Sequence, residues 1–178
     1  MQNPIIVALD VPSTQKALKL AEELAPVVGA FKVGKQLFVN GGPDAVRKLR
    51  GLGAKIFLDL KFHDIPNTVA KAVQSATDLG VAMLTVHASG GSEMLGAAES
   101  AGHEQAAMLR SEPPLILGVT VLTSMDDANL AELGIDESAQ DRVLRLAKLA
   151  AGAGLRGLVC SPQEIKMIRG ELGDGIQL

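Results

Sequence analysis

Three ionisable side chains lie close together near the middle of the chain, in the order acid, base, acid: Asp59, Lys61 and Asp64. They follow the largely apolar run 55–58, and an apolar run that ends in charges is typical of a buried strand that carries ionisable groups to its C-terminal edge. Because side chains alternate faces along a strand, we expect Asp59 and Lys61 to point the same way and Asp64 to lie beyond the strand. A lysine ammonium beside a carboxylate, away from water, suits a general acid that protonates a carbanion.

A surface salt bridge on a loop between strand and helix would explain the same charges, and the charges alone slightly favour that interpretation. The residues that follow predict how the segment continues. Pro66 fits the first turn of a helix, because that turn needs no N–H from it. Apolar residues at 69, 72, 73, 76 and 79 then fall on one helical face, and Gly80 is placed to end the helix.

The rest of the chain repeats this strand–helix pattern. Further strands are predicted at 5–9, 29–35, 81–86, 115–119 and 157–160. The continuous apolar run 5–9 predicts a strand buried on both faces. Helices are expected after Pro12-Ser13, after a turn at 41–44, from 90–92 to a break at Pro113-Pro114, around 143–150, and from Ser161-Pro162.

Six strand–helix units in strict alternation predict an α/β fold with a parallel sheet and helices outside it. Polar residues follow several of the strands: Asp10, Lys32, Asp59, Lys61, His87 and Thr123. A (β/α)8 TIM barrel places its chemistry on that edge of the sheet. An open doubly wound sheet is the alternative, but the residues after the first strand do not form a glycine-rich dinucleotide loop.

The length of the chain bears on this prediction. A complete barrel needs about 250 residues, with about 200 as a lower limit, and this chain has 178. We therefore expect residues 1–178 to form a single TIM-barrel domain that is incomplete at the C-terminus. Residues 175–178 would lead into a seventh strand.

Composition excludes several classes of function. The net charge of −3 argues against a general binder of nucleic acid or of membrane surfaces. The absence of Trp and Tyr, with only four Phe, argues against a base-stacking platform. The single Cys160 fits a reducing compartment, and the run 5–9 is too short to span a bilayer. We expect a cytoplasmic protein.

Residues 59–68 fill every fixed position of the motif Asp-x-Lys-x-x-Asp-Ile-Pro-Asn-Thr, and the chain thereby resembles the orotidine 5′-monophosphate decarboxylase family. Related sugar-phosphate enzymes share the first part of the motif, whereas the Ile-Pro-Asn-Thr extension is highly specific. The likeness extends to 7–10, 31–34, 86–91 and 119–124. It implies decarboxylation of orotidine 5′-monophosphate to UMP, the last step of de novo pyrimidine biosynthesis. It also implies a homodimer with shared active sites, without a cofactor and without a metal.

The resemblance also implies catalytic roles. Lys61 would donate a proton to C6 of the pyrimidine. Asp59 and Asp64 of the partner subunit would flank the substrate carboxylate, and Lys32 would complete an alternating row of charges. A fixed ammonium at C6 would stabilise the negative charge that departing CO₂ leaves there, and would then neutralise it.

Binding roles follow in the same way. Asp10 and Lys32 would hold ribose hydroxyls, and Thr68 would reach the ribose across the dimer interface. Ile65 would also bind substrate, and Thr123, or its backbone, would contact the pyrimidine edge. The family binds the phosphate with an Arg and backbone amides after its seventh and eighth strands, which residues 1–178 lack. Because such an enzyme uses phosphate binding energy to assemble its site, we expect residues 1–178 alone to be inactive or very poor.

Two other functions are open. A Mg²⁺-dependent decarboxylase or aldolase acting on a sugar phosphate such as 3-keto-gulonate 6-phosphate shares the Asp-x-Lys-x-x-Asp motif. It carries an acidic metal ligand on the second strand, where this chain has Lys32, and a lysine would repel the ion. A non-catalytic remnant retained for dimerisation or binding is the second alternative.

Individual residues also have simpler interpretations. Asp10 could cap the first helix, and Lys32 could be a surface lysine that extends its ammonium into solvent. His63 and His87 with nearby acids follow no known metal-ligand spacing, and a hydrogen-bonded packing role is preferred for His87. Cys160 is expected to pack as a small hydrophobic residue.

Overall fold

The computed structural model describes residues 3–178, so Met1 and Gln2 of the predicted domain lie outside the described residues. It contains a six-stranded parallel sheet in the order β1-β2-β3-β4-β5-β6. The strands are β1 Ile6–Ala8, β2 Ala30–Gly34, β3 Ile56–Phe62, β4 Met83–His87, β5 Leu115–Val119 and β6 Gly157–Val159. The α-helices are α1 Thr14–Leu24, α2 Lys35–Gly51, α3 Pro66–Asp78, α4 Gly91–Leu109, α5 Asp127–Glu132, α6 Ala139–Gly152 and α7 Ile165–Leu172. Short 3₁₀ helices lie at Ala25–Val27, Ala88–Gly90 and Pro162–Glu164.

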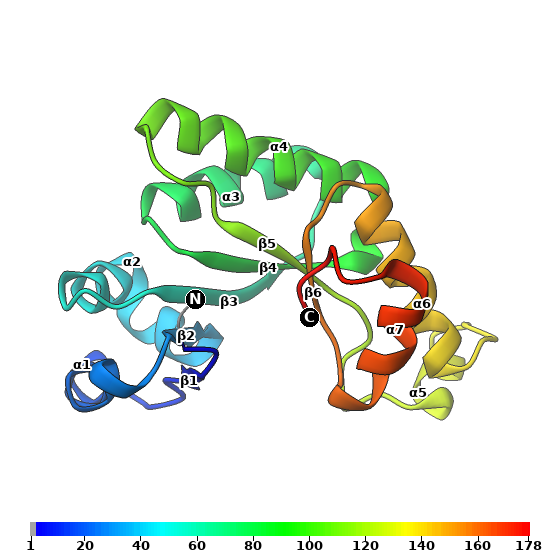
Figure 1. Ribbon diagram of the computed structural model, residues 1–178, viewed down its shortest axis with the longest axis horizontal. Coiled ribbons are helices and arrows are strands. Elements are labelled where there is room, and N and C mark those ends of the chain that lie inside the picture. The colour runs from blue at the N-terminus through cyan, green and yellow to red at the C-terminus, as the bar shows by residue number, and fades with distance from the viewer. Residues whose placement is uncertain (1–2) are drawn as a thin grey trace.

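Each strand pairs in parallel with the next strand of the chain, as in a barrel built from successive strand–helix units. The sheet curls, and the helices follow its outer side in an arc from α1 and α2, through α3 and α4, to α6 and α7 (Figure 1). The strand–helix alternation and the curled parallel sheet confirm the predicted TIM-barrel fold class.

The C-terminal residues extend the sheet beyond β6. Gln177 forms a parallel bridge with Gly157. Its N–H donates to the Arg156 carbonyl, and its own carbonyl accepts from the N–H of Leu158, both at 2.9 Å. Residues near the C-terminal end thus pair with β6 as a lead-in to a further strand would, and the seventh strand itself stays a prediction.

The first strand is less buried than its sequence predicts. Ile5 lies outside β1 and is 55% exposed, and Ile6 is also exposed. Among residues 3–178, β1 pairs only with β2 and stands at one end of the sheet. The prediction of burial on both faces is wrong here because one side of β1 has no neighbouring strand.

Most helix boundaries agree with the sequence signals. The Ser13 hydroxyl caps α1 by accepting from the Lys16 N–H, and Pro66 occupies the first turn of α3. The turn expected at 41–44 is instead a kink inside α2, where Gly42 has a φ of 57° before Pro43.

Two boundaries differ from the prediction. α4 does not run to Pro113-Pro114; it ends at Leu109, and Arg110 closes it in the left-handed conformation with a φ of 52°. The short helix α5 was not predicted. Its N-terminus is a capping box, in which Asp126 and Asn129 each bind the other's backbone N–H.

Two apolar layers enclose the sheet. The larger core packs the outer side of the strands against the helices. A smaller cluster gathers Ala30, Phe57, Met83 and Leu117 from four adjacent strands. Because residues two apart on a strand share a face, the side chains that follow Ala30, Phe57 and Met83 by two positions lie above this cluster on the concave face of the sheet. We call these four residues the apolar floor.

No helix within residues 3–178 has both the length and the apolar character needed to cross a membrane.

Candidate active site

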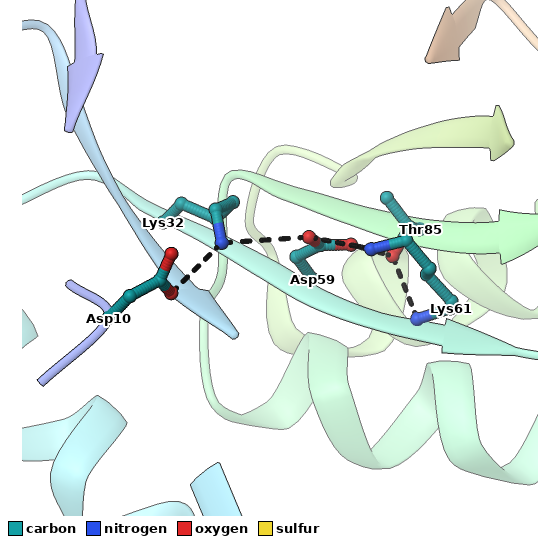
Figure 2. Close-up of polar contacts among 5 residues, drawn as sticks. All are labelled: Asp10, Lys32, Asp59, Lys61 and Thr85. Atoms are coloured by element: carbon teal, nitrogen blue, oxygen red, sulfur yellow. Dashed lines mark hydrogen bonds and ion pairs between the residues drawn. The ribbon is translucent and has the colours of Figure 1, made fainter. Parts of the chain in front are cut away.

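Four charged side chains of alternating sign form a row above the apolar floor (Figure 2). The Lys32 ammonium lies 3.3 Å from Asp10 Oδ1 and 3.7 Å from Asp59 Oδ2. The Lys61 ammonium donates to Asp59 Oδ1 at 2.7 Å and to Oδ2 at 2.9 Å. The row therefore reads Asp10, Lys32, Asp59, Lys61, so the structure brings these four sequence-predicted residues together.

The strands explain why these side chains meet. Lys32 is paired with Phe57 across β2 and β3, and Asp59 lies two residues after Phe57 on the same face. Asp10 follows β1, and the Leu9 N–H donates to the Lys32 carbonyl, which holds the chain after β1 beside β2. Parallel pairing thus brings residues that are far apart in the sequence to one edge of the sheet.

Asp59 is the central group of the row, and its side chain is only 13% exposed. Burial alone would raise the pKa of this carboxyl. The hydrogen bonds from Lys61 and Thr85, together with the positive charges of Lys61 and Lys32, outweigh burial and lower the pKa below its usual value. Asp59 is therefore held as a carboxylate between two ammonium groups.

The backbone at Lys61 departs from a regular strand. Leu58 pairs with Leu84 and Phe62 with Val86, so three residues of β3 stand opposite one residue of β4. Within this bulge Lys61 has a φ of 54°, a left-handed conformation that costs a residue with a Cβ roughly 1–2 kcal/mol. Asp59 and Lys61 do come together, but through this bulge rather than through the simple alternation that the sequence suggested.

Thr85 is the residue opposite the bulge, and the sequence analysis did not identify it. Its side chain is buried, and its hydroxyl donates to Asp59 Oδ1 at 3.0 Å. The Thr85 hydroxyl oxygen, Oγ1, also accepts the backbone N–H of Lys61 at 2.9 Å. The only signal in the sequence was one hydroxyl within the apolar run 81–86.

Asp10 is the most exposed member of the row. The Asp10 side chain is 63% exposed, whereas Lys32 and Lys61 are mostly shielded. Asp10 does not cap α1, because Ser13 does, and Lys32 points to two carboxylates rather than into solvent. The alternative of a surface salt bridge on a loop is also wrong, because Asp59 and Lys61 lie within β3.

The other predicted site residues lie outside the row. Asp64, Ile65 and Thr68 are exposed around the N-terminus of α3, and Ile65 is 66% exposed. The Asp64 carboxylate accepts the N–H of Ile65 at 2.7 Å. Thr123 is exposed in the segment between β5 and α5. Within residues 3–178, no hydrogen bond or ion pair joins any of these four side chains to the charged row.

His87 ends β4 beside the row, and its ring centroid lies 5.4 Å from that of His63. Burial lowers the pKa of His87, and the positive charges of His63, Lys35 and Lys61 lower it further, against an opposing effect of Asp59. His87 is partly buried, which agrees with a packing role, but the predicted hydrogen bond to its ring is not found within residues 3–178.

Cys160 packs partly buried against the core, and burial raises the pKa of its thiol. No cluster of three or more His, Cys, Asp or Glu side chains with metal-binding geometry occurs in residues 3–178.

This arrangement has a clear chemical capacity. Two ammonium groups flank one carboxylate, and the apolar floor lies below them on the same face of the sheet. Such fixed charges are placed before any ligand arrives, so they can stabilise negative charge that develops nearby with little reorganisation. The Lys61 ammonium also carries a proton that it can transfer.

Comparison with known proteins places the chain in a family. A sequence profile of the "Orotidine 5'-phosphate decarboxylase / HUMPS family" matches residues 3–178. The chain is 49% identical to the orotidine 5'-phosphate decarboxylase of Pseudoalteromonas translucida over 174 residues, which are 98% of this chain and 73% of that protein. It is 52% identical to the protein of the same name from Syntrophotalea carbinolica over 169 residues, which are 95% of this chain and 69% of that protein.

A solved structure agrees. The crystal structure of orotidine 5'-phosphate decarboxylase from Lactobacillus acidophilus superposes with a TM-score of 0.85 at 39% identity, covering 98% of this chain and 78% of that one. With the profile match over nearly the whole chain and this agreement in fold, the chain belongs to the orotidine 5'-phosphate decarboxylase / HUMPS family.

Proposed function

We propose that the protein decarboxylates orotidine 5′-monophosphate to UMP and so serves the last step of de novo pyrimidine biosynthesis. The observation that carries the proposal is the row Asp10, Lys32, Asp59, Lys61, in which a shielded carboxylate lies between two ammonium groups. The relatives that are about 50% identical to this chain over the aligned residues carry the name of that enzyme.

Lys61 acts as the proton donor in this proposal. The bond between C6 and the carboxylate breaks, CO₂ leaves, and the electron pair stays on C6. The Lys61 ammonium stabilises that pair as it forms and then transfers one proton to C6, and the lysine regains a proton from solvent. No cofactor takes part in these steps.

Asp59 orients the proton donor. It accepts from the Lys61 ammonium through both of its oxygens, which fixes the nitrogen at one position above the sheet. Lys32 balances the charge of Asp59 from the other side. Asp10 and Lys32, at the open end of the row, would bind ribose hydroxyls, and the 63% exposure of Asp10 leaves it accessible for that contact.

The proposal includes a homodimer with shared sites. Asp64, Ile65 and Thr68 are exposed around the start of α3 and lie outside the row of their own subunit. A second copy that presents these residues to the row would add a carboxylate next to Lys61 and extend the alternation of charge. Thr123 would contact the pyrimidine edge from the segment after β5. The cytoplasmic location is also part of the proposal and is supported by the composition.

The magnesium-dependent alternative meets an obstacle at Lys32. Its ammonium lies between Asp10 and Asp59, so the two carboxylates that could bind a cation are already neutralised by a lysine. Mg²⁺ prefers carboxylate and water oxygens in near-octahedral geometry, and a fixed positive charge between those oxygens repels it.

The decisive experiment follows the ultraviolet absorbance of orotidine 5′-monophosphate with the complete gene product, in buffer containing EDTA. We expect turnover with the wild-type protein and a loss of at least about 10³-fold in kcat for Lys61→Ala, because both charge stabilisation and proton donation are removed. Lys71→Ala, which replaces an exposed lysine of α3 outside the row, is the matched control and should keep the wild-type rate.

Each contrary outcome has a distinct meaning. Equal rates for the wild type and Lys61→Ala would refute the mechanism. Activity that EDTA abolishes would favour the magnesium-dependent alternative. A wild-type protein that neither turns over the substrate nor binds UMP would favour the non-catalytic remnant.

A further inference from the structure

We propose that Thr85 is a positioning residue, whose hydroxyl holds the bulge of β3 in the one conformation that sets the Lys61 ammonium against Asp59. This inference rests on the proposed function, since Lys61 and Asp59 are its proton donor and the partner of that donor. Thr85 itself need not touch substrate, because it acts through those two residues.

The register of the sheet shows why the bulge needs a partner. Between the pairs Leu58–Leu84 and Phe62–Val86, β3 has three residues and β4 has only Thr85. The extra residues of a bulge lose their regular ladder partners, and a buried N–H without an acceptor is strongly disfavoured. The Lys61 N–H is such a group, and Thr85 Oγ1 accepts it at 2.9 Å.

The same hydroxyl fixes the acid. With its oxygen accepting from Lys61, the hydroxyl hydrogen of Thr85 is directed to Asp59 Oδ1 at 3.0 Å. The Thr85 side chain therefore binds the backbone of Lys61 and the carboxylate of Asp59 at once. Figure 2 shows Thr85 at the Asp59–Lys61 end of the row, beside both residues.

Thr85 is itself held firmly. It is 1% exposed, and its backbone lies in the regular pairing of β4 with β5, opposite Leu117 of the apolar floor. As a β-branched residue in a strand it has few side-chain rotamers available. The Thr85 hydroxyl thus has a fixed position, and the Lys61 backbone, with its left-handed conformation, is hydrogen-bonded to it.

The test compares the complete gene product with Thr85→Val, which keeps the shape and removes the hydroxyl, and with Thr85→Ser, which keeps the hydroxyl. We expect Thr85→Val to lower kcat by about 10–100-fold, because a small displacement of a catalytic group costs that much, and to change KM little. Thr85→Ser should recover most of the rate. The matched control is Thr77→Val, which removes another buried hydroxyl that donates only to the Val73 carbonyl within α3.

Two readouts separate positioning from general stability. Amide hydrogen exchange at Lys61 should accelerate in Thr85→Val and stay unchanged in Thr77→Val, since only the first loses the acceptor of that N–H. The pKa of Asp59, followed by NMR of its carboxyl carbon, should rise in Thr85→Val, because one hydrogen bond that lowers it is gone. If Thr85→Val does not fold, Thr85→Ala against Thr85→Ser makes the same comparison.

The inference is overturned if Thr85→Val keeps the wild-type kcat, or if Thr85→Ser loses as much as Thr85→Val. It is also overturned if Thr77→Val lowers kcat equally, since the loss would then reflect stability alone. Any of these three outcomes would refute the role of Thr85 but not the proposed decarboxylase function, so long as Lys61→Ala abolishes turnover. An active Lys61→Ala protein would instead refute the proposed function, while the exchange rate at Lys61 would still test the bulge.

Discussion

The paired edge of β3 and β4 differs sharply from the segment that follows β5. At the first, Asp59, Lys61 and Thr85 are joined by hydrogen bonds and ion pairs, and are mostly shielded from solvent. At the second, Thr120 is buried and donates to the Val159 carbonyl, but Thr123, three residues later, is exposed. The fold by itself holds the first set of side chains in place, whereas Thr123 in the second region is exposed to solvent.

One part of the proposed site is already formed before a ligand arrives, and another part is not. Charges that must act on a developing carbanion gain most from being fixed in advance, because reorganisation during the reaction is then avoided. Residues proposed to contact the substrate, such as Thr123 and Ile65, lie where a ligand or a second subunit can reach them. In the proposed dimer, the charged groups would be in place beforehand, and the contacts that recognise the substrate would form when the subunits and the ligand come together.

After the loss expected for Lys61→Ala, the largest effect at the preformed edge is expected from Asp59→Asn. The change leaves Lys32 and Lys61 without the anion between them and removes the bidentate acceptor of the Lys61 ammonium. We expect kcat to fall by about 10²–10³-fold with less change in KM, measured on the complete gene product. Asp44→Asn is the matched control, because Asp44 pairs only with Arg47 on the surface of α2. An unchanged kcat in Asp59→Asn would remove the contrast between the two regions.

A subunit-mixing experiment tests whether the exposed Asp64 belongs to the site of the partner subunit. If Asp64 completes the site of its partner, Lys61→Ala and Asp64→Asn inactivate different halves of a shared site. Unfolding and refolding the two inactive variants together should then restore about one quarter of the wild-type activity, because half of the random dimers carry one intact site. Each variant refolded alone is the control. No recovery in the mixture would place Asp64 outside the partner's site.

The smallest expected effect concerns pH and His87. Its pKa in the folded protein is lowered from 6.5 by burial and by His63, Lys35 and Lys61, so the unfolded chain takes up the proton first as the pH falls. The free energy of unfolding should therefore decrease below pH 6.5 until the folded-state pKa is reached, and then stop responding to this group.

Urea midpoints at about pH 7.5 and about pH 5 measure this dependence. His87→Gln should flatten it. Asp59 acts in the same direction in a lower window, where stability is lost as the pH falls from 3.8 through its lowered pKa. An unaltered pH dependence in His87→Gln would show that the histidine is not held neutral.

Much of this could be predicted from the sequence because it depends on local patterns. Apolar runs located all six strands, and the spacing of Asp59 and Lys61 placed both charges at one edge. Lys32 and Asp10 were expected there from their positions after apolar runs and from the family resemblance. The helix α5 was missed because it is short, although the capping residues Asp126 and Asn129 were visible.

The bulge and the role of Thr85 could not be predicted in the same way. A left-handed Lys61 has no local signature, since lysine does not favour that conformation, and only the register between β3 and β4 requires it. A threonine in an apolar run is also an ordinary strand residue. Its importance becomes visible only when two neighbouring strands are placed side by side.

The apolar floor has a further consequence. Phe57, Met83 and their neighbours place apolar side chains on the sheet below the charges, so the row is shielded from water on that side. A ligand that covers the exposed side of the row would displace the remaining water as it binds. The local dielectric constant then falls at the moment when the charges are needed, and every attraction within the row becomes stronger. The floor thus makes the strength of the electrostatic field depend on whether the site is filled.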